Sequence, residues 1–79
     1  MSPDIRERAA KVLSSALGRP LDPSGNPDRK EIPGWDSLKH VEIVLMLEEE
    51  FHVRFTAQEV AALGSLDEIV RKITGKHGT

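Results

Sequence analysis

The stretch Gly34–Ile43, with the sequence GWDSLKHVEI, is the point where a proline- and glycine-rich segment gives way to the strongest helical pattern in the chain. Asp36 is a favourable N-cap residue, so a helix is predicted to begin at Ser37. The first backbone N–H groups of a helix lack partners within the helix and lie at the positive end of its dipole. A phosphate ester on the Ser37 hydroxyl would meet these donors.

The helix that begins at Ser37 is predicted to end at Phe51 and to be apolar over about 220° of its circumference. One sector, which is enough to bury a surface helix against a core, consists of Ile43, Val44, Leu47 and Phe51. The neighbouring sector consists of Leu38, Val41 and Leu45. We interpret it as a docking surface for partner proteins, with an acidic border of Glu42, Glu48 and Glu49. The alternative is that two neighbouring helices cover both sectors.

A further helix is predicted on the N-terminal side, over about Pro3–Leu17. Ser2 can cap this helix, Pro3 suits its first position, and Gly18 suits its end. Apolar residues recur in it at helical spacing and form one stripe, which consists of Ile5, Ala9, Val12, Leu13, Ala16 and Leu17. We expect this stripe to pack against the core.

Two capping-box patterns follow the central helix, at Thr56–Glu59 and at Ser65–Glu68. They predict a short helix over Ala57–Ala62 and a last helix over Leu66–Thr74, with Gly75 ending it. The residues of the last helix that are expected to face inward are Leu66, Ile69, Val70 and Ile73. The tail after Gly75 is expected to fray.

The segment from Gly18 to Trp35 is predicted to be a long loop, because its prolines and glycines preclude a long helix or a central strand. Leu21, Ile32 and Trp35 are expected to pin its ends to the core, whereas residues 24–30 are expected to be freer. Trp35 is either an anchor for the start of the next helix or a contact for a ligand arm. The fold class is therefore all-α: a small four-helix bundle with a long loop between the first two helices and a short third helix.

Composition limits the classes of function. The 79 residues provide for one small core, so we expect a single domain over residues 1–79 with an ordered part of about 3–75. The net charge of −2 gives no basis for nucleic-acid binding, and the acids are concentrated between Asp36 and Phe51. The sequence holds no cysteine and no long apolar segment. We expect a soluble, cytoplasmic monomer without a membrane span.

Enzymatic chemistry is not expected. Ser37 and His40 lie three residues apart, but their side chains diverge by about 60° on one helix, and no Gly-x-Ser-x-Gly elbow is present. The histidines, His40, His52 and His77, do not have the spacing of metal ligands. We therefore predict no catalytic residue and no metal site.

Asp36-Ser37-Leu38, the apolar helix that ends in LEEEF at Phe51, the long preceding loop and the two capped helices together resemble the acyl carrier protein family over about residues 5–73. The resemblance implies that Ser37, flanked by Asp36 and Leu38, carries 4′-phosphopantetheine. A phosphopantetheinyl transferase would attach it from coenzyme A with Mg²⁺, which Asp36 would help to place. The thiol of the arm would hold acyl groups as thioesters, which fits a chain without cysteine. The partner contacts implied by the resemblance are Leu38, Val41, Glu42, Leu45 and Glu48.

The sequence also departs from the fatty-acid carriers of primary metabolism that it resembles. Those carriers are strongly acidic and tend to have an acid directly after Asp-Ser-Leu, where this chain has Lys39. Trp35 is also more like carriers of specialised pathways. We therefore expect a carrier for a polyketide, aminoacyl or modified-lipid pathway, with an acyl- or aminoacyl-activating ligase and acyltransferases or synthases as partners. The alternatives are an aminoacyl or peptidyl carrier and an unmodified, carrier-like helical protein-binding module.

Overall fold

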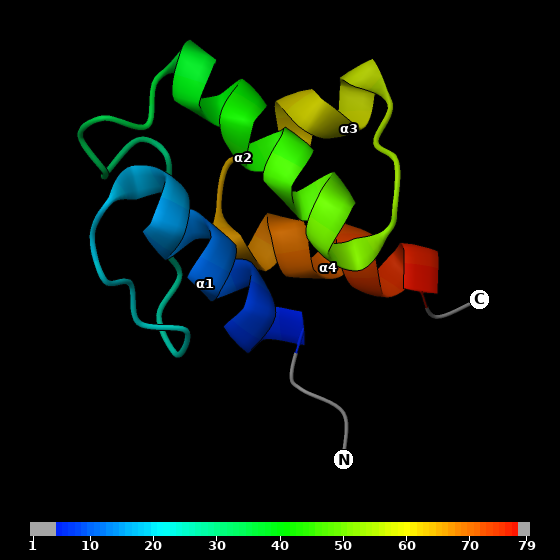
Figure 1. The fold of residues 1–79 in the computed structure, drawn as a ribbon, viewed down its shortest axis with the longest axis horizontal. Helices are drawn as coiled ribbons and strands as arrows, with labels where there is room; N and C mark the ends of the chain where they lie inside the picture. The colour runs from blue at the N-terminus through cyan, green and yellow to red at the C-terminus, as the bar shows by residue number, and fades with distance from the viewer. Residues whose placement is uncertain (1–4, 78–79) are drawn as a thin grey trace.

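The computed structural model describes residues 5–77, and these residues form four helices (Figure 1). The helices are α1 (Ile5–Leu17), α2 (Ser37–Phe51), α3 (Ala57–Ala62) and α4 (Leu66–His77). α1 packs against α2 and α4, and α3 lies on the other side of α2 in the view of Figure 1. Within the described residues the only β-type pairing is an isolated bridge between Asp28 and Ser65. The expected all-α fold, with its long loop and short third helix, is confirmed.

The bounds of the helices can be compared with the predictions. α2 and α3 have the predicted bounds, while Ser2 and Pro3, the expected start of the first helix, lie outside the described residues. The predicted stop at Gly75 is wrong, because α4 continues through this residue to His77. Glycine costs only about 1 kcal/mol relative to alanine inside a helix. The residue after Gly75 makes tertiary contacts that hold the last turn, and the rule that glycine ends a helix takes no account of such contacts.

This residue is Lys76, which joins the end of α4 to α3 and to the connection before it. Its Nζ lies 2.9 Å from Glu59 Oε1 and 5.4 Å from the centre of the Phe55 ring. Glu59 also belongs to the predicted capping box of α3, in which Thr56 N–H donates to Glu59 Oε1 and Glu59 N–H donates to Thr56 Oγ1. One carboxylate therefore serves the start of α3 and the end of α4.

The core is built from buried apolar side chains of α1, α2 and α4, together with Trp35 just before α2 and Leu63 just after α3. Its members are Ala9, Ala10, Val12, Leu13, Trp35, Ile43, Val44, Leu47, Phe51, Leu63, Leu66, Ile69 and Ile73. Leu21 and Ile32 pack against it, as expected for the ends of the long loop. α3 contributes no buried residue. Its apolar contact with the core is the partly buried Val60, so polar contacts carry more of the attachment of α3 than of the other helices.

A chain of buried hydrogen bonds links α3 to the start of α2. Trp35 Nε1–H donates to His40 Nδ1 at 3.0 Å, and His40 Nε2 lies 2.7 Å from the carbonyl oxygen of Val60 in α3. An indole nitrogen can only donate, so Nδ1 is the acceptor and Nε2 carries the proton that is given to Val60. Trp35 and His40 are 3% and 4% exposed. We call these two hydrogen bonds the Trp–His relay. They make Trp35 an anchor for the start of α2.

The middle of the long loop is tied to the connection between α3 and α4. Leu66 N–H donates to Pro27 O at 3.0 Å, and Arg29 N–H donates to Gly64 O at 2.8 Å. The expectation that residues 24–30 are freer is wrong. The first N–H groups of a helix need acceptors from elsewhere, and the loop supplies two to α4, because Asn26 Oδ1 also accepts the N–H of Asp67 at 2.9 Å.

The Trp–His relay predicts that Trp35→Phe lowers the free energy of unfolding by about 1–3 kcal/mol, because it leaves Nδ1 of the buried His40 without a donor. Urea unfolding of the variant and the native chain measures this loss. In a His40→Leu background the same Trp35→Phe substitution should cost less, since no acceptor is left unsatisfied. An equal loss in both backgrounds would mean that Trp35 acts through packing alone.

The Glu59 contacts predict a pH dependence. The N–H of Thr56, and after it Lys76, hold the pKa of the Glu59 carboxyl below its ordinary value of 4.5. Because the pKa of Glu59 is lower in the folded chain than in the unfolded chain, its charge stabilises the folded state above pH 4.5. This contribution is lost as the pH falls through the pKa that Glu59 has in the folded chain. Glu59→Gln keeps the acceptor of the capping box but not the charge. Its melting temperature should be lower than that of the native chain at pH 7, with a smaller gap at pH 3. A constant gap contradicts this prediction.

Candidate functional site

α2 begins at Ser37, as predicted from the sequence. Asp36 is the N-cap, in an extended conformation, and its Oδ1 accepts the N–H of Lys39 at 2.8 Å. Gly34 precedes it with a φ of 95°, a conformation in which a side chain would be strained. Ser37 is the first residue of the helix and is exposed. The glycine turn and the cap thus present the Ser37 hydroxyl to solvent at the end of α2.

His40 cannot serve Ser37 as a base. Both of its ring nitrogens are engaged in the Trp–His relay, and its ring is buried between the loop and α3. The described part of the chain also holds no cluster of three or more histidine, cysteine or acidic side chains that could bind a metal ion. The geometry at Ser37 therefore offers an accessible hydroxyl rather than an activated nucleophile.

Arg29 is a site residue that the sequence analysis missed. Its Nη2 lies 3.3 Å from Ser37 Oγ, although the two residues are eight positions apart and Arg29 belongs to the long loop. The side chain reaches Ser37 because the Arg29 backbone is fixed to Gly64. No local pattern indicates such a contact, because it depends on how the loop crosses the end of α3.

The second apolar sector of α2 is uncovered. Leu38, Val41 and Leu45 are 75%, 51% and 59% exposed, and they are the large apolar side chains of the described residues that stand out in solvent. The alternative that neighbouring helices cover both sectors is wrong. We call these three residues the apolar strip; it begins directly beside Ser37 and runs along α2.

The acids that border the apolar strip are partly engaged within the chain. Glu42 Oε1 lies 2.7 Å from Lys39 Nζ, so the two charges offset one another. Glu48 Oε2 accepts the N–H of Phe55 at 2.9 Å and so holds the connection between α2 and α3. Glu48, expected among the partner contacts, thus has a role within the fold that a helical wheel does not reveal.

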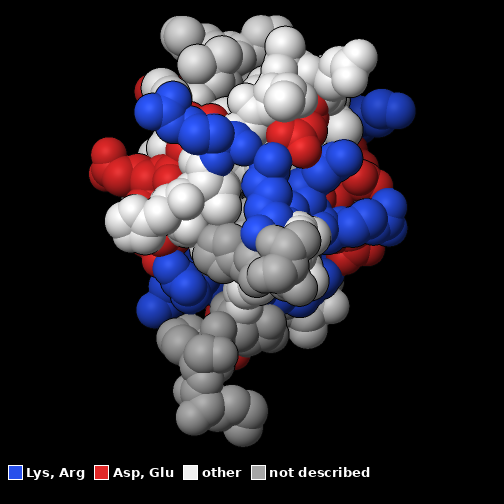
Figure 2. Space-filling model, turned by 90° about the vertical axis from the view of Figure 1, so that its right-hand side faces the viewer, with Lys and Arg blue, Asp and Glu red and all other residues white. Residues whose placement is uncertain are grey.

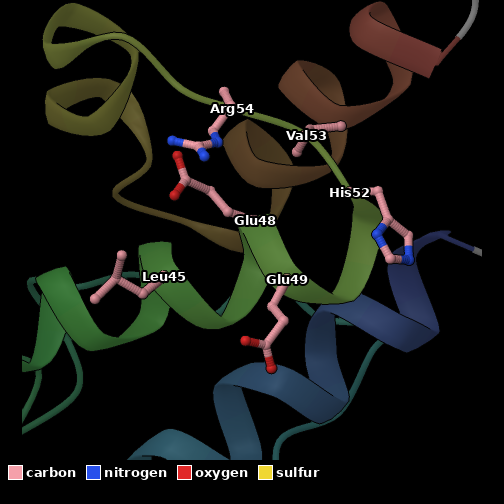
Figure 3. Close-up of a pocket in the computed structure, with 6 residues that line it drawn as sticks. All are labelled: Leu45, Glu48, Glu49, His52, Val53 and Arg54. Carbon is pink, nitrogen blue, oxygen red and sulfur yellow. The ribbon is translucent and has the colours of Figure 1, made fainter.

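A hollow of about 650 Å³ lies at the far end of the apolar strip (Figure 3). Its lining residues are Leu45, Glu48, Glu49, His52, Val53 and Arg54. Figure 3 shows the side chains of Glu48 and Arg54 pointing toward one another, while Glu49 points away from both. The border of the apolar strip at this end is therefore of mixed charge rather than uniformly acidic.

The face of the molecule where α4 ends is richer in basic side chains. Figure 2 shows Lys and Arg side chains gathered on the side of the molecule where α4 ends, among fewer acidic ones. α4 carries Arg71 and Lys72 at its middle and Lys76 in its last turn, where positive charge suits the helix dipole. None of the described helices is long and apolar enough to cross a membrane.

Comparisons with known proteins agree with the site. Residues 5–73 match the family described as phosphopantetheine attachment site. The chain is also 28% identical over 74 residues to Acyl carrier protein 3 of Ralstonia nicotianae, an alignment that covers 91% of this chain and 84% of that protein. Since the family match spans most of the sequence, from the start of α1 into α4, the chain belongs to the acyl carrier protein family, whose members bear 4′-phosphopantetheine and have no catalytic activity of their own.

Proposed function

We propose that the Ser37 hydroxyl is the attachment point of the 4′-phosphopantetheine arm, and that the chain presents acyl groups on this arm to the enzymes of one pathway. The observation that carries the proposal is the exposed hydroxyl at the capped start of α2, within the matched segment. The residues around it fit the group, because Arg29 brings a positive charge to Ser37 Oγ. The arm supplies the thiol that forms the thioester, since the sequence holds no cysteine.

Attachment needs a phosphopantetheinyl transferase. The Ser37 oxygen would form a phosphodiester with the phosphate that bears pantetheine in coenzyme A, and adenosine 3′,5′-bisphosphate would leave while the serine proton goes to the transferase. This chain positions the Ser37 hydroxyl and does not supply a general base, because both ring nitrogens of His40 are hydrogen-bonded to Trp35 and Val60. Asp36 uses Oδ1 as the helix cap, so Oδ2 is the oxygen that we propose for Mg²⁺.

We propose the apolar strip as the surface that partner enzymes contact, with Glu42 and Glu48 at its edges. Its exposure and its start beside Ser37 support this role. The partners would be the transferase, an acyl- or aminoacyl-activating ligase, and acyltransferases or synthases. Because Glu42 is paired with Lys39, we expect contact to depend more on apolar burial than on a basic partner surface.

The Lys39–Glu42 pair also supports a specialised pathway over primary fatty-acid synthesis. It removes net acidity directly after Ser37, and a partner selected for a strongly acidic helix would lose its ion pairs there. A polyketide, aminoacyl or modified-lipid pathway is the proposal, in a single carrier domain whose helices share one core. The second candidate is an unmodified protein-binding module, which the exposed apolar strip would also suit.

Modification of Ser37 is tested by intact mass after incubation with coenzyme A, Mg²⁺ and a broad-specificity phosphopantetheinyl transferase. We expect the native chain to gain one phosphopantetheine and Ser37→Ala to gain none. Ser15→Ala, which removes an exposed serine of α1, is the matched control and should be modified like the native chain. If a folded native chain gains no phosphopantetheine with two different transferases, the carrier proposal is wrong and the protein-binding module is the remaining candidate.

The apolar strip is tested by the kinetics of the same modification. Leu45→Ala removes an exposed side chain two turns from Ser37, so the chain should keep its melting temperature within a few degrees. Loss of a buried contact of about 1.4 kcal/mol at the docking surface lowers kcat/KM of the transferase about tenfold. Gln58→Ala, an exposed change on α3, should leave kcat/KM unchanged. Unaltered kcat/KM in both Val41→Ala and Leu45→Ala would contradict the proposed docking role.

A further inference from the structure

Arg29 is the cation whose hydrogen bond reaches the hydroxyl of Ser37, with Nη2 3.3 Å from Oγ. Lys39 also lies near the start of α2, but its Nζ is paired with Glu42 at 2.7 Å. Lys30, next to Arg29, is exposed, and no ion pair of the described residues involves its side chain. Arg29 is therefore the basic side chain that is already directed at the Ser37 oxygen.

The backbone around Arg29 is held on both sides. Its own N–H donates to Gly64 O at 2.8 Å, and the carbonyl of Pro27 accepts Leu66 N–H at 3.0 Å. On the other side, Asp28 Oδ1 accepts the N–H of Lys30 at 2.7 Å. The side chain of Arg29 therefore spans from a loop that is fixed to the α3–α4 connection to the first residue of α2.

Attachment of the arm changes what Arg29 faces. The hydroxyl becomes an ester oxygen, a poor acceptor, and a phosphodiester with one negative charge lies beside it. A guanidinium group matches the two free oxygens of a phosphate with a pair of parallel hydrogen bonds. The carboxylate of Asp36, one residue away, repels the same phosphate, so a neighbouring cation offsets that repulsion as well.

We propose that Arg29 binds the phosphodiester of the arm and holds the base of the arm against the loop that precedes α2. The inference rests on the proposed modification of Ser37. Because Arg29 is anchored at the α3–α4 connection, its contact draws the base of the arm toward that side. The apolar strip on α2 then stays open to a partner while the arm is attached.

The test compares apo and phosphopantetheinylated forms of the native chain, of Arg29→Gln and of Lys30→Gln. Lys30→Gln removes the same charge one residue away and is the matched control. Intact mass first establishes that each chain carries one arm. The melting temperature of both forms, the ¹H–¹⁵N signal of the Arg29 Nε–H group and the ³¹P signal of the diester are then measured.

In the native chain we expect attachment to shift the Arg29 Nε–H signal. The melting-temperature deficit of Arg29→Gln should be about 2–5 °C larger with the arm than without it, the size expected of an exposed ion pair in a small domain. The ³¹P signal should differ between Arg29→Gln and the native chain and not between Lys30→Gln and the native chain. Salt at about 1 M should remove most of the extra deficit.

Equal deficits of Arg29→Gln in both forms, with an unmoved Nε–H signal in an arm-bearing native chain, would overturn the role of Arg29 and leave the modification of Ser37 intact. A native chain that gains no arm overturns the proposed function and this inference with it. If Arg29→Gln does not fold, the Nε–H signal of the native chain and the ³¹P signals of the native chain and of Arg29→Lys still decide the question.

Discussion

The Trp–His relay is the interaction on which the placement of Ser37 depends. α2 begins on a surface loop, and a capped helix start alone would not fix its orientation relative to the rest of the molecule. Trp35 is buried directly before the cap, and its indole proton holds His40 one turn into the helix. His40 in turn holds α3 through the Val60 carbonyl. Two buried polar groups thus satisfy each other and join three segments, which is the arrangement that makes a buried polar network stabilising.

The same need for hydrogen-bond partners organises the long loop. A helix of the length of α4 exposes N–H groups at its start, and here the loop carbonyl of Pro27 accepts one of them. That exchange fixes residues that a reading of composition alone treats as mobile, and it places Arg29 against Ser37. Between α1 and α2 the loop passes the start of α4, where it makes this contact.

Local and periodic features of the fold could be predicted from the sequence, and long-range contacts could not. The cap at Asp36 and the capping box at Thr56 involve residues a few positions apart, so α2 and α3 were predicted with their bounds. The width of the apolar arc left two interpretations of Leu38, Val41 and Leu45 open, and their exposure confirms the one that was favoured. The contact of Arg29 with Ser37 could not be predicted, because tertiary structure brings the two residues together. The same reason explains why α4 passes through Gly75.

The charges of α2 show how a helix with four acids in its sequence can still present a largely apolar face. Lys39 offsets Glu42, Arg8 Nε lies 3.0 Å from Glu50 Oε2, and Glu48 is used by the backbone of Phe55. Each of these carboxylates already has a contact within the chain, so a basic group of a partner would have to compete with that contact. Under the proposed docking role, selection of a partner would depend on whether it has an apolar surface shaped to the apolar strip, because no described segment of this chain buries that strip.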